Sequence, residues 1–115
     1  IDLFPTTCEL CGFEAPSRIQ GRSLTKLLSN ATNSVRESAF SVSPMQSGYL
    51  LRNERWAYLQ YGENAEKGVE LYDMQADPQQ ITNLAMKPES ATIIAERQKT
   101  LKKTLSEIRS SDLNR

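Results

Sequence analysis

The stretch GYLLRNERWAYLQY, residues 48–61, decides how the middle of this chain folds. It holds two runs rich in aromatic and aliphatic residues, 48–52 and 55–61, separated by Asn53 and Glu54. Runs of this kind predict strands, and two turn-forming residues between them predict an antiparallel hairpin. We therefore expect a sheet to be built around this hairpin.

The predicted turn also sets which residues lie opposite one another. With two residues in the turn, Leu51 faces Trp56 and Tyr49 faces Tyr58 on one side of the sheet. Cross-strand pairs of large apolar and aromatic side chains are typical of a core. We therefore expect this aromatic side of the hairpin to be the buried one.

Further strands are predicted on both sides of the hairpin. The segments 39–43 and 69–74 are short apolar runs of the same type, bounded by residues such as Pro44 and Gly68. With the two strands of the hairpin they make a small antiparallel sheet of about four strands.

Helices are predicted toward the two ends of the chain. Asp2 can cap a short helix over residues 3–11, which Gly12 ends. Ser23 can cap a second short helix that carries several leucines. A long helix of about 20 residues begins at Pro88, and one of its sides is an apolar stripe. The stripe consists of Ile94, Leu101, Leu105 and Ile108. The predicted fold class is α+β, with short N-terminal helices and a long C-terminal helix packed on the sheet.

The composition excludes several classes of partner. The 115 residues include 14 lysines and arginines and 14 aspartates and glutamates. No net charge therefore draws the chain to nucleic acid or to an acidic membrane surface. No apolar run approaches the ~20 residues that span a bilayer. We expect neither nucleic acid nor a membrane as a partner.

Cys8 and Cys11 have the spacing of a redox pair or of half a zinc site. Structural zinc takes four ligands, whereas this chain has two cysteines and no histidine. A redox pair usually opens a helix behind a strand, but these two residues fall near the end of a predicted helix. We expect both to be small buried hydrophobic residues without a disulfide.

Six short blocks of the chain stand in a characteristic order. They are IDLFPT at 1–6, QGRSL at 20–24, GYLLR at 48–52, ELYD at 70–73, DP at 77–78 and TNL at 82–84. Together they resemble the tail of the sulfatase family, in the alkaline-phosphatase-like superfamily. The branch they resemble contains iduronate sulfatases and many bacterial sulfatases. One departure is Gln80, where family members commonly have glutamate.

The resemblance implies that the chain is the noncatalytic C-terminal part of a sulfatase, a sulfuric ester hydrolase. Residues 1–38 would then be the end of the catalytic-domain region and a connecting segment, and residues 39–115 the C-terminal subdomain. The subdomain would complete the fold and supply one wall of the substrate cleft. Its partner would be the catalytic domain of the same polypeptide. Family resemblance suggests a periplasmic, secreted or lysosomal setting.

The catalytic signature of that family is missing from this chain. The nucleophile resembles Cys-x-Pro-x-Arg or Ser-x-Pro-x-Arg, in which the first residue becomes formylglycine. No proline here has cysteine or serine two positions before it. We expect no catalytic residue in this chain, and we expect calcium and formylglycine in the missing catalytic domain. Whether the chain counts as an enzyme by itself stays open.

No metal site is expected either. Asp73, Asp77 and Asn83 look like part of a calcium ligand set, which needs six to eight oxygens. They lack the glycine-centred loop of an EF-hand, and aspartate before proline is typical of a turn. We therefore interpret all three as turn formers.

Arg52 and Arg55 are the candidate substrate-binding residues. The predicted turn sets them opposite one another, and like charges so placed cost free energy unless an anion compensates them. The planar fork of arginine suits a sulfate or a sugar carboxylate. The alternative is that Glu54, Glu63 or solvent compensates both charges.

A function of a different class also stays open. The chain would then be an independent protein-interaction module that uses Trp56 and the tyrosines of the sheet as its binding surface. If the chain is the C-terminal part of a sulfatase, by contrast, the catalytic domain needs a surface of this chain to pack against. For that case we expect an apolar patch around the helix of residues 3–11, which the catalytic domain would cover.

Overall fold

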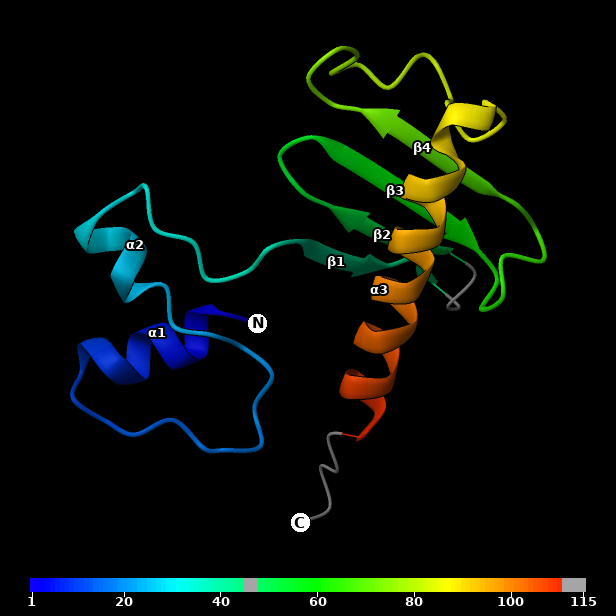
Figure 1. Cartoon of the computed structure of the whole chain (residues 1–115). Helices are drawn as coiled ribbons and strands as arrows, with labels where there is room; N and C mark the ends of the chain where they lie inside the picture. The colour runs from blue at the N-terminus through cyan, green and yellow to red at the C-terminus, as the bar shows by residue number, and fades with distance from the viewer. Residues whose placement is uncertain (45–47, 111–115) are drawn as a thin grey trace. The chain divides into compact units, whose positions relative to one another are not determined.

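The computed structural model describes residues 1–44 and 48–110 (Figure 1). The elements, in order, are α1 (Leu3–Leu10), α2 (Thr25–Ser29), β1 (Ala39–Val42), β2 (Gly48–Arg52), β3 (Trp56–Tyr61), β4 (Val69–Asp73), the 3-10 helix η2 (Pro88–Ser90) and α3 (Ala91–Ser110). The chain divides into two compact units. The first is Ile1–Glu37 together with the chain from Thr104 onward, and the second is Ser38–Lys103.

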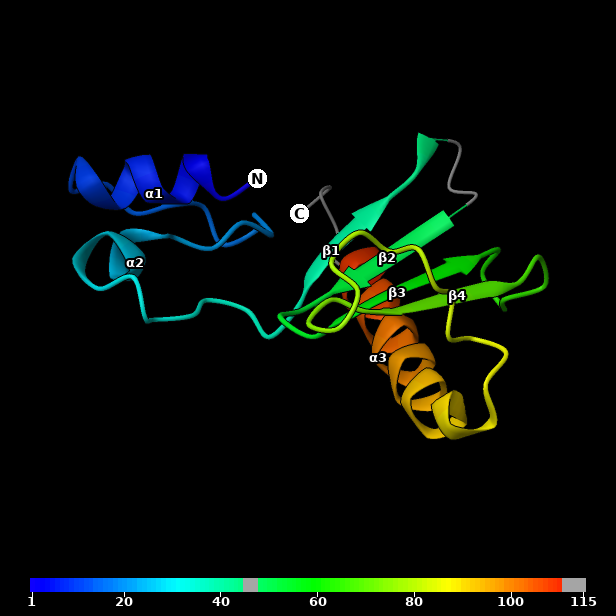
Figure 2. The same ribbon diagram turned by 90° about the horizontal axis from the view of Figure 1, so that it is seen from above.

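The second unit is built on a four-stranded antiparallel sheet in the order β1-β2-β3-β4. The part of α3 that belongs to this unit lies against one face of the sheet (Figure 1, Figure 2). The largest fully buried side chains are Tyr58, Leu71 and Leu101, which come from β3, β4 and α3. The predicted α+β fold is confirmed, and each predicted strand agrees with the structure to within one residue at either end.

The predicted register of the hairpin is wrong by two residues. In the structure Leu51 lies opposite Tyr58, and Arg52 lies opposite Ala57. The reason is the side chain of Asn53, whose Oδ1 accepts hydrogen bonds from the backbone N–H of Arg55 at 3.1 Å and of Trp56 at 2.7 Å. Asn53 is thus the first residue of the turn instead of lying inside it.

The buried face of the hairpin is nevertheless the predicted one. Side chains alternate between the two faces of a strand, so a slip of two residues leaves every side chain on its original face. Tyr49, Leu51 and Tyr58 are 5%, 2% and 0% exposed. All three lie on the face that α3 covers, because a side-chain hydrogen bond joins Tyr58 to Gln98 of α3.

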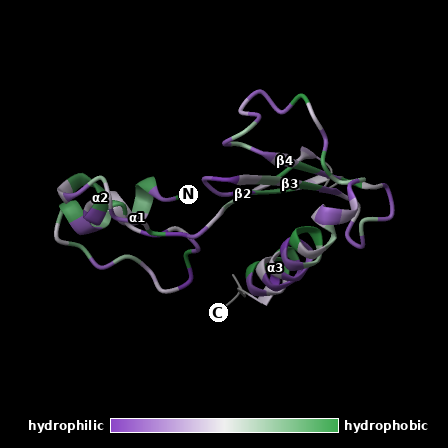
Figure 3. Cartoon of the chain, turned by 45° about the horizontal axis from the view of Figure 1, so that its top comes forward, coloured by the Kyte–Doolittle hydropathy of each residue, from purple (hydrophilic) through white to green (hydrophobic). Residues whose placement is uncertain are grey.

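The apolar stripe of α3 is also as predicted. Leu101 and Leu105 are buried, Ile94 and Ile108 are half-buried, and the lysines of this helix are exposed. Figure 3 shows apolar and polar residues on different sides of α3. Burying such a stripe on a sheet is the main source of stability for a helix of this kind.

The free edge of β4 is covered by the segment that follows the strand. The side-chain Oδ1 of Asn83 accepts a hydrogen bond from the backbone N–H of Leu71 at 3.1 Å. The backbone N–H of Leu84 donates to the carbonyl oxygen of Leu71 at 2.8 Å. Both backbone groups of Leu71 on this edge are therefore satisfied, which leaves them unavailable for pairing with another strand.

The first unit contains the two short helices. Gly12 has a φ of 74°, so it ends α1 in the left-handed conformation that was predicted. Asp2, however, makes no side-chain cap on α1. The second helix begins at Thr25 and not directly after Ser23, although the Ser23 hydroxyl accepts a hydrogen bond from the Thr25 N–H at 3.3 Å.

Candidate functional site

Arg55 is held by its own chain. Its Nε and Nη2 both donate to Oδ2 of Asp73 at 3.2 Å, and its guanidinium lies 4.8 Å from the centroid of the Trp56 ring. Burial works to raise the pKa of Asp73, but hydrogen bonds from two backbone N–H groups and from Arg55 lower it below its usual value. Arg55 therefore joins the hairpin turn to the end of β4.

Arg52 lies apart from Arg55 and has an exposed side chain at the end of β2. In the part of the chain that the structure describes, no hydrogen bond or ion pair involves its guanidinium. The sequence placed the two arginines opposite one another, whereas the structure sets Ala57 opposite Arg52. Strand pairing thus does not set the two guanidinium groups opposite one another. The Arg52 guanidinium is exposed with its donors available to a ligand, whereas that of Arg55 is partly engaged by Asp73.

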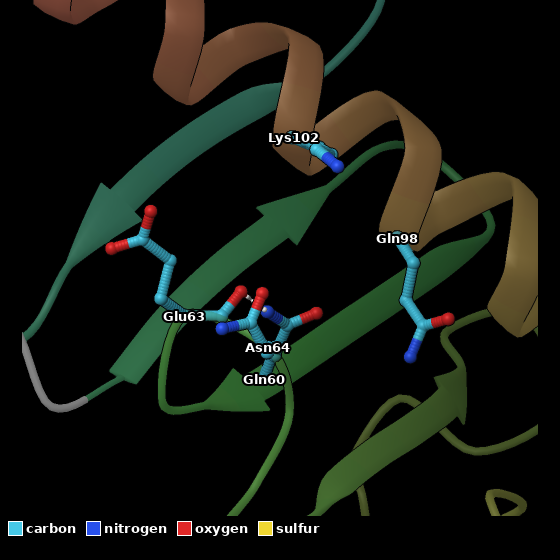
Figure 4. A pocket seen from close by; sticks show the side chains of 5 residues that line it. All are labelled: Gln60, Glu63, Asn64, Gln98 and Lys102. Carbon is cyan, nitrogen blue, oxygen red and sulfur yellow. Dashed lines mark hydrogen bonds between the residues drawn. The ribbon is translucent and has the colours of Figure 1, made fainter.

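A polar hollow lies between α3 and the end of β3. Figure 4 shows Gln98 and Lys102 reaching it from α3, while Gln60, Glu63 and Asn64 come from β3 and the connection after it. Gln60 is buried, and its amide is fully used. Its oxygen accepts from the Tyr58 hydroxyl at 2.8 Å, and its nitrogen donates to the carbonyls of Gly62 and Glu63 at 3.1 and 2.8 Å.

Tyr58, whose hydroxyl donates to Gln60 of this hollow, is not an acid or base near neutral pH. Burial raises the pKa of Tyr58 to about 12, against a smaller opposite effect of its hydrogen bond to Gln98. The hydroxyl therefore stays protonated and serves as a donor to Gln60. We interpret the hollow as part of the packing of α3 on the sheet.

A carboxylate on the opposite face of the sheet binds two tyrosines. Glu70 accepts hydrogen bonds from Tyr61 at 3.1 Å through Oε1 and from Tyr72 at 2.8 Å through Oε2. Burial and the Glu70 carboxylate raise the pKa of Tyr61, and the hydrogen bond to Glu70 raises that of Tyr72. Both phenols stay neutral donors. This cluster was not predicted, although Glu70 and Tyr72 share one face of a strand by their spacing.

The acidic turn after β4 caps backbone groups. Asp73 Oδ1 accepts from the N–H of Gln75 at 3.1 Å and of Ala76 at 3.3 Å, and Asp77 Oδ2 accepts from Thr82 at 2.7 Å. The predicted turn-forming role is confirmed. Over residues 1–44 and 48–110, no group of three or more histidines, cysteines, aspartates or glutamates is placed to hold a metal ion.

The first unit contains an ion pair that the sequence did not predict. Asp2 Oδ1 and Oδ2 accept from Arg36 Nη2 and Nη1, each at 2.5 Å, and Oδ1 also accepts from the Arg22 backbone N–H at 2.9 Å. The hydrogen bond from Arg36 lowers the pKa of Asp2 to about 2. The Thr6 hydroxyl accepts from the Leu24 N–H at 2.9 Å. These bonds connect the block at 1–6 to the block at 20–24.

The prediction that both cysteines are buried is wrong. Cys8 and Cys11 are free thiols; Cys8 is half-buried and Cys11 is exposed. Both lie toward the end of α1, where neither side chain is fully covered. Among the described residues, no helix is both long and apolar enough to cross a bilayer.

Comparison with known protein families gives one match that covers almost the whole chain. Residues 1–110 match the family model described as N-sulphoglucosamine sulphohydrolase, C-terminal. The chain is 31% identical over 96 residues to arylsulfatase K of Mus musculus, which covers 74% of this chain and 17% of that protein. It is 35% identical over 104 residues to delta 4,5-hexuronate-2-O-sulfatase of Bacteroides thetaiotaomicron, covering 84% and 21%.

Solved structures agree with the sequence comparisons. The structure of a 2-O GAG sulfatase superposes with a TM-score of 0.77 at 29% identity, covering 95% of this chain and 25% of that one. The chain therefore spans about a fifth of the curated relatives and a quarter of this solved chain.

Proposed function

Since the chain belongs to the N-sulphoglucosamine sulphohydrolase C-terminal family and is the noncatalytic C-terminal part of a sulfatase, we propose that the full polypeptide hydrolyses sulfate esters. The observation that carries this proposal is the match over residues 1–110 to a C-terminal family. The chain spans about a fifth of relatives that are named sulfatases. This chain would complete the fold and supply one wall of the substrate cleft.

The catalytic groups belong to the rest of the polypeptide in this proposal. The prolines of this chain lack the cysteine or serine that becomes formylglycine in sulfatases. The carboxylates of Asp73 and Asp77 are engaged in capping backbone N–H groups, so no step of the reaction is assigned to a metal held here. Formylglycine and calcium are expected in the catalytic domain, which is the partner of this chain.

The proposed boundary between catalytic region and subdomain lies at residues 38 and 39. It is supported by the change from the first compact unit to the second between Glu37 and Ser38. The end of α3, from Thr104 onward, belongs with the first unit, so the proposed subdomain contributes to both units.

Arg52 and Arg55 receive different roles in the proposal. Arg52 has exposed donors at the end of β2 and would contact the anionic substrate at the edge of the cleft. Arg55, bound to Asp73 and stacked on Trp56, would support the turn that presents Arg52. These separate roles replace the prediction that the two arginines face each other and bind one anion.

We expect the full polypeptide to turn over a sulfate ester and the isolated 115-residue chain to show none. A chromogenic aryl sulfate and a 2-O-sulfated unsaturated hexuronate disaccharide serve as substrates, because relatives are named for such esters. Release of sulfate is measured with the full polypeptide and, separately, with the isolated chain. Turnover by the isolated chain that disappears on mutating one of its residues would contradict the assignment.

In the full polypeptide, Arg52→Ala is expected to raise KM for an anionic sugar sulfate by about 10-fold with a small change in melting temperature, as loss of a charged hydrogen bond predicts. The matched control is Arg55→Ala, which removes the contact to Asp73 and is expected to lower the melting temperature instead. Kinetics and thermal unfolding are measured on both variants. An unchanged KM for Arg52→Ala would show that Arg52 is an exposed residue that does not contact the substrate.

The interaction module is the weaker candidate. Tyr49 and Tyr58 are buried, so the aromatic face lies beneath α3 and is not a surface on which a partner could dock. Trp56 is half-buried, with the Arg55 guanidinium over its ring. Tyr49 and Tyr58 therefore belong to the core of the second unit.

A further inference from the structure

The first unit exposes an unusual amount of apolar surface. Its large apolar side chains with most of their area exposed are Ile1 (85%), Leu3 (77%), Phe4 (55%), Leu10 (64%), Phe13 (71%) and Leu28 (69%). Single exposed apolar residues are common in soluble proteins, but contiguous apolar patches mark sites of interaction. Five of these six residues lie within α1 or within three residues of its ends, so they gather around one helix.

The exposed side of α1 is more apolar than the side that faces the rest of the first unit. Pro5 and Thr6 are buried against the first unit, while Leu3, Phe4 and Leu10 are exposed. Helical geometry places residues 3, 4, 7 and 11 on one side, away from residues 5, 6 and 9. An exposed side that is the more apolar one is the reverse of the usual surface helix, and it is typical of a side that another part of a protein covers.

The outer side of α1 carries no charge that burial would leave unpaired. The sequence of α1 is LFPTTCEL, and its one charged residue is Glu9. The Glu9 carboxylate accepts a hydrogen bond from the Thr25 hydroxyl at 2.7 Å, which directs it toward α2. Hydrogen bonds from Ser23 and Thr25 lower the pKa of Glu9, so it stays ionised where it is bound.

The polar atom on the outer side is also satisfied. Thr7 is exposed, but its hydroxyl donates to the carbonyl oxygen of Leu3 within the helix at 2.9 Å. Burying an unpaired hydroxyl costs free energy, and this hydrogen bond within the helix removes that cost. Cys11, which completes this side, behaves as a small apolar residue when buried.

We propose that the outer face of α1, defined as Leu3, Phe4, Thr7, Leu10 and Cys11, is the surface on which the catalytic domain of the same polypeptide packs. The inference rests on the proposed function, since it takes the catalytic domain as occupant. Relatives of this chain are about four times its length, so most of each relative lies outside the segment matched here. The outer face of α1 has no charge, and its one hydroxyl already has a hydrogen-bond partner. Such a face is suited to packing against an apolar surface of the partner from which water is excluded.

Thiol labelling of the full polypeptide tests the proposal. In a Cys8→Ser background, Cys11 is expected to react with a maleimide at least about 100-fold more slowly in the native protein than in denaturant, because only transient opening exposes a covered group. The matched control is Ser17→Cys in the same unit, where Ser17 is exposed in a loop, and it is expected to label rapidly. Labelled peptides are identified by mass spectrometry.

Substitution of the same face gives a second, independent measurement. Leu10→Asp in the full polypeptide is expected to cut the yield of soluble folded protein at least about 10-fold, since it places a charge in an apolar interface. Ser17→Asp, the matched control, is expected to leave the yield unchanged. Tolerance of Leu10→Asp together with rapid labelling of Cys11 would overturn the proposal.

The outcomes separate this inference from the proposed function. If the full polypeptide hydrolyses sulfate esters while Cys11 labels as fast as the Ser17→Cys control, the docking face is wrong and the function stands. If Cys11 is protected in a protein that hydrolyses no sulfate ester, the docking face stands and the function is wrong. Protection that is lost when a dimer dissociates on dilution would assign the face to a second copy of the chain and contradict the proposal.

Discussion

Leu71→Ala is expected to lower the free energy of unfolding of the sheet-containing unit by about 3 to 4 kcal/mol, the middle of the range for a buried leucine. Leu71 is 0% exposed at the centre of β4. Removing three carbons there leaves a cavity lined by side chains from the sheet and α3. The backbone bonds of Leu71 to Asn83 and Leu84 hinder collapse of the strand into that cavity.

The measurement is urea unfolding of the chain followed by tryptophan fluorescence. Trp56 is the one tryptophan in the sequence and lies at the start of β3, so its emission reports on the sheet. The control is Ile81→Ala in the connection after β4, where the side chain is 76% exposed and the expected loss is below about 0.5 kcal/mol. Equal losses in the two variants would mean that Leu71 is not in the core.

Asp2→Ala is expected to destabilise the first unit by about 2 kcal/mol. The change removes both bonds to Arg36 and leaves the Arg22 backbone N–H without its acceptor. Breaking one side of a buried pair costs about 3 to 5 kcal/mol, and the smaller value applies here because both side chains are about a quarter exposed. Hydrogen exchange of the Arg22 amide in the full polypeptide should become about 30-fold faster.

Asp2→Asn is the matched control, because its carbonyl oxygen still accepts from the Arg22 N–H while the charge is lost. We expect its exchange rate to fall between those of the wild type and Asp2→Ala. Identical Arg22 exchange in the wild type and Asp2→Ala would show that the ion pair does not hold this segment.

The same ion pair predicts a dependence on pH. The folded pKa of Asp2, about 2, lies below the ordinary value of 3.8 for an aspartate. The carboxylate therefore stabilises the unit fully above the unfolded pKa, and this contribution is lost as pH falls from about 4 toward 2. Protection of the Arg22 amide should decrease over that window in the wild type and stay flat in Asp2→Asn.

Local patterns predicted the elements of the fold because each depends on a few neighbouring residues. The four strands follow from short apolar runs between turn residues, and the face of each strand follows from the alternation of side chains. The apolar stripe of α3 follows from helical periodicity. These signals need no knowledge of what lies elsewhere in the chain.

The candidate site was less predictable, since it depends on bonds between distant residues. The Asn53 carboxamide shifts the pairing register by two residues, so that Arg52 no longer lies opposite Arg55. Asp73, 18 positions after Arg55, binds the Arg55 guanidinium. Asp2 was predicted as a helix cap, but the Arg36 guanidinium, 34 residues away, binds its carboxylate.

The sequence by itself determined the fold class, the strands, the buried face of the hairpin and the lineage. The spacing of apolar residues and the order of the six family-like blocks can be read from the chain alone. Only the tertiary structure decided the register, the partners of Arg55 and Asp2, and the exposure of Cys11. Each of these depends on which groups from separate segments come within hydrogen-bonding or packing distance. A pattern of residue types does not show which distant groups come that close together.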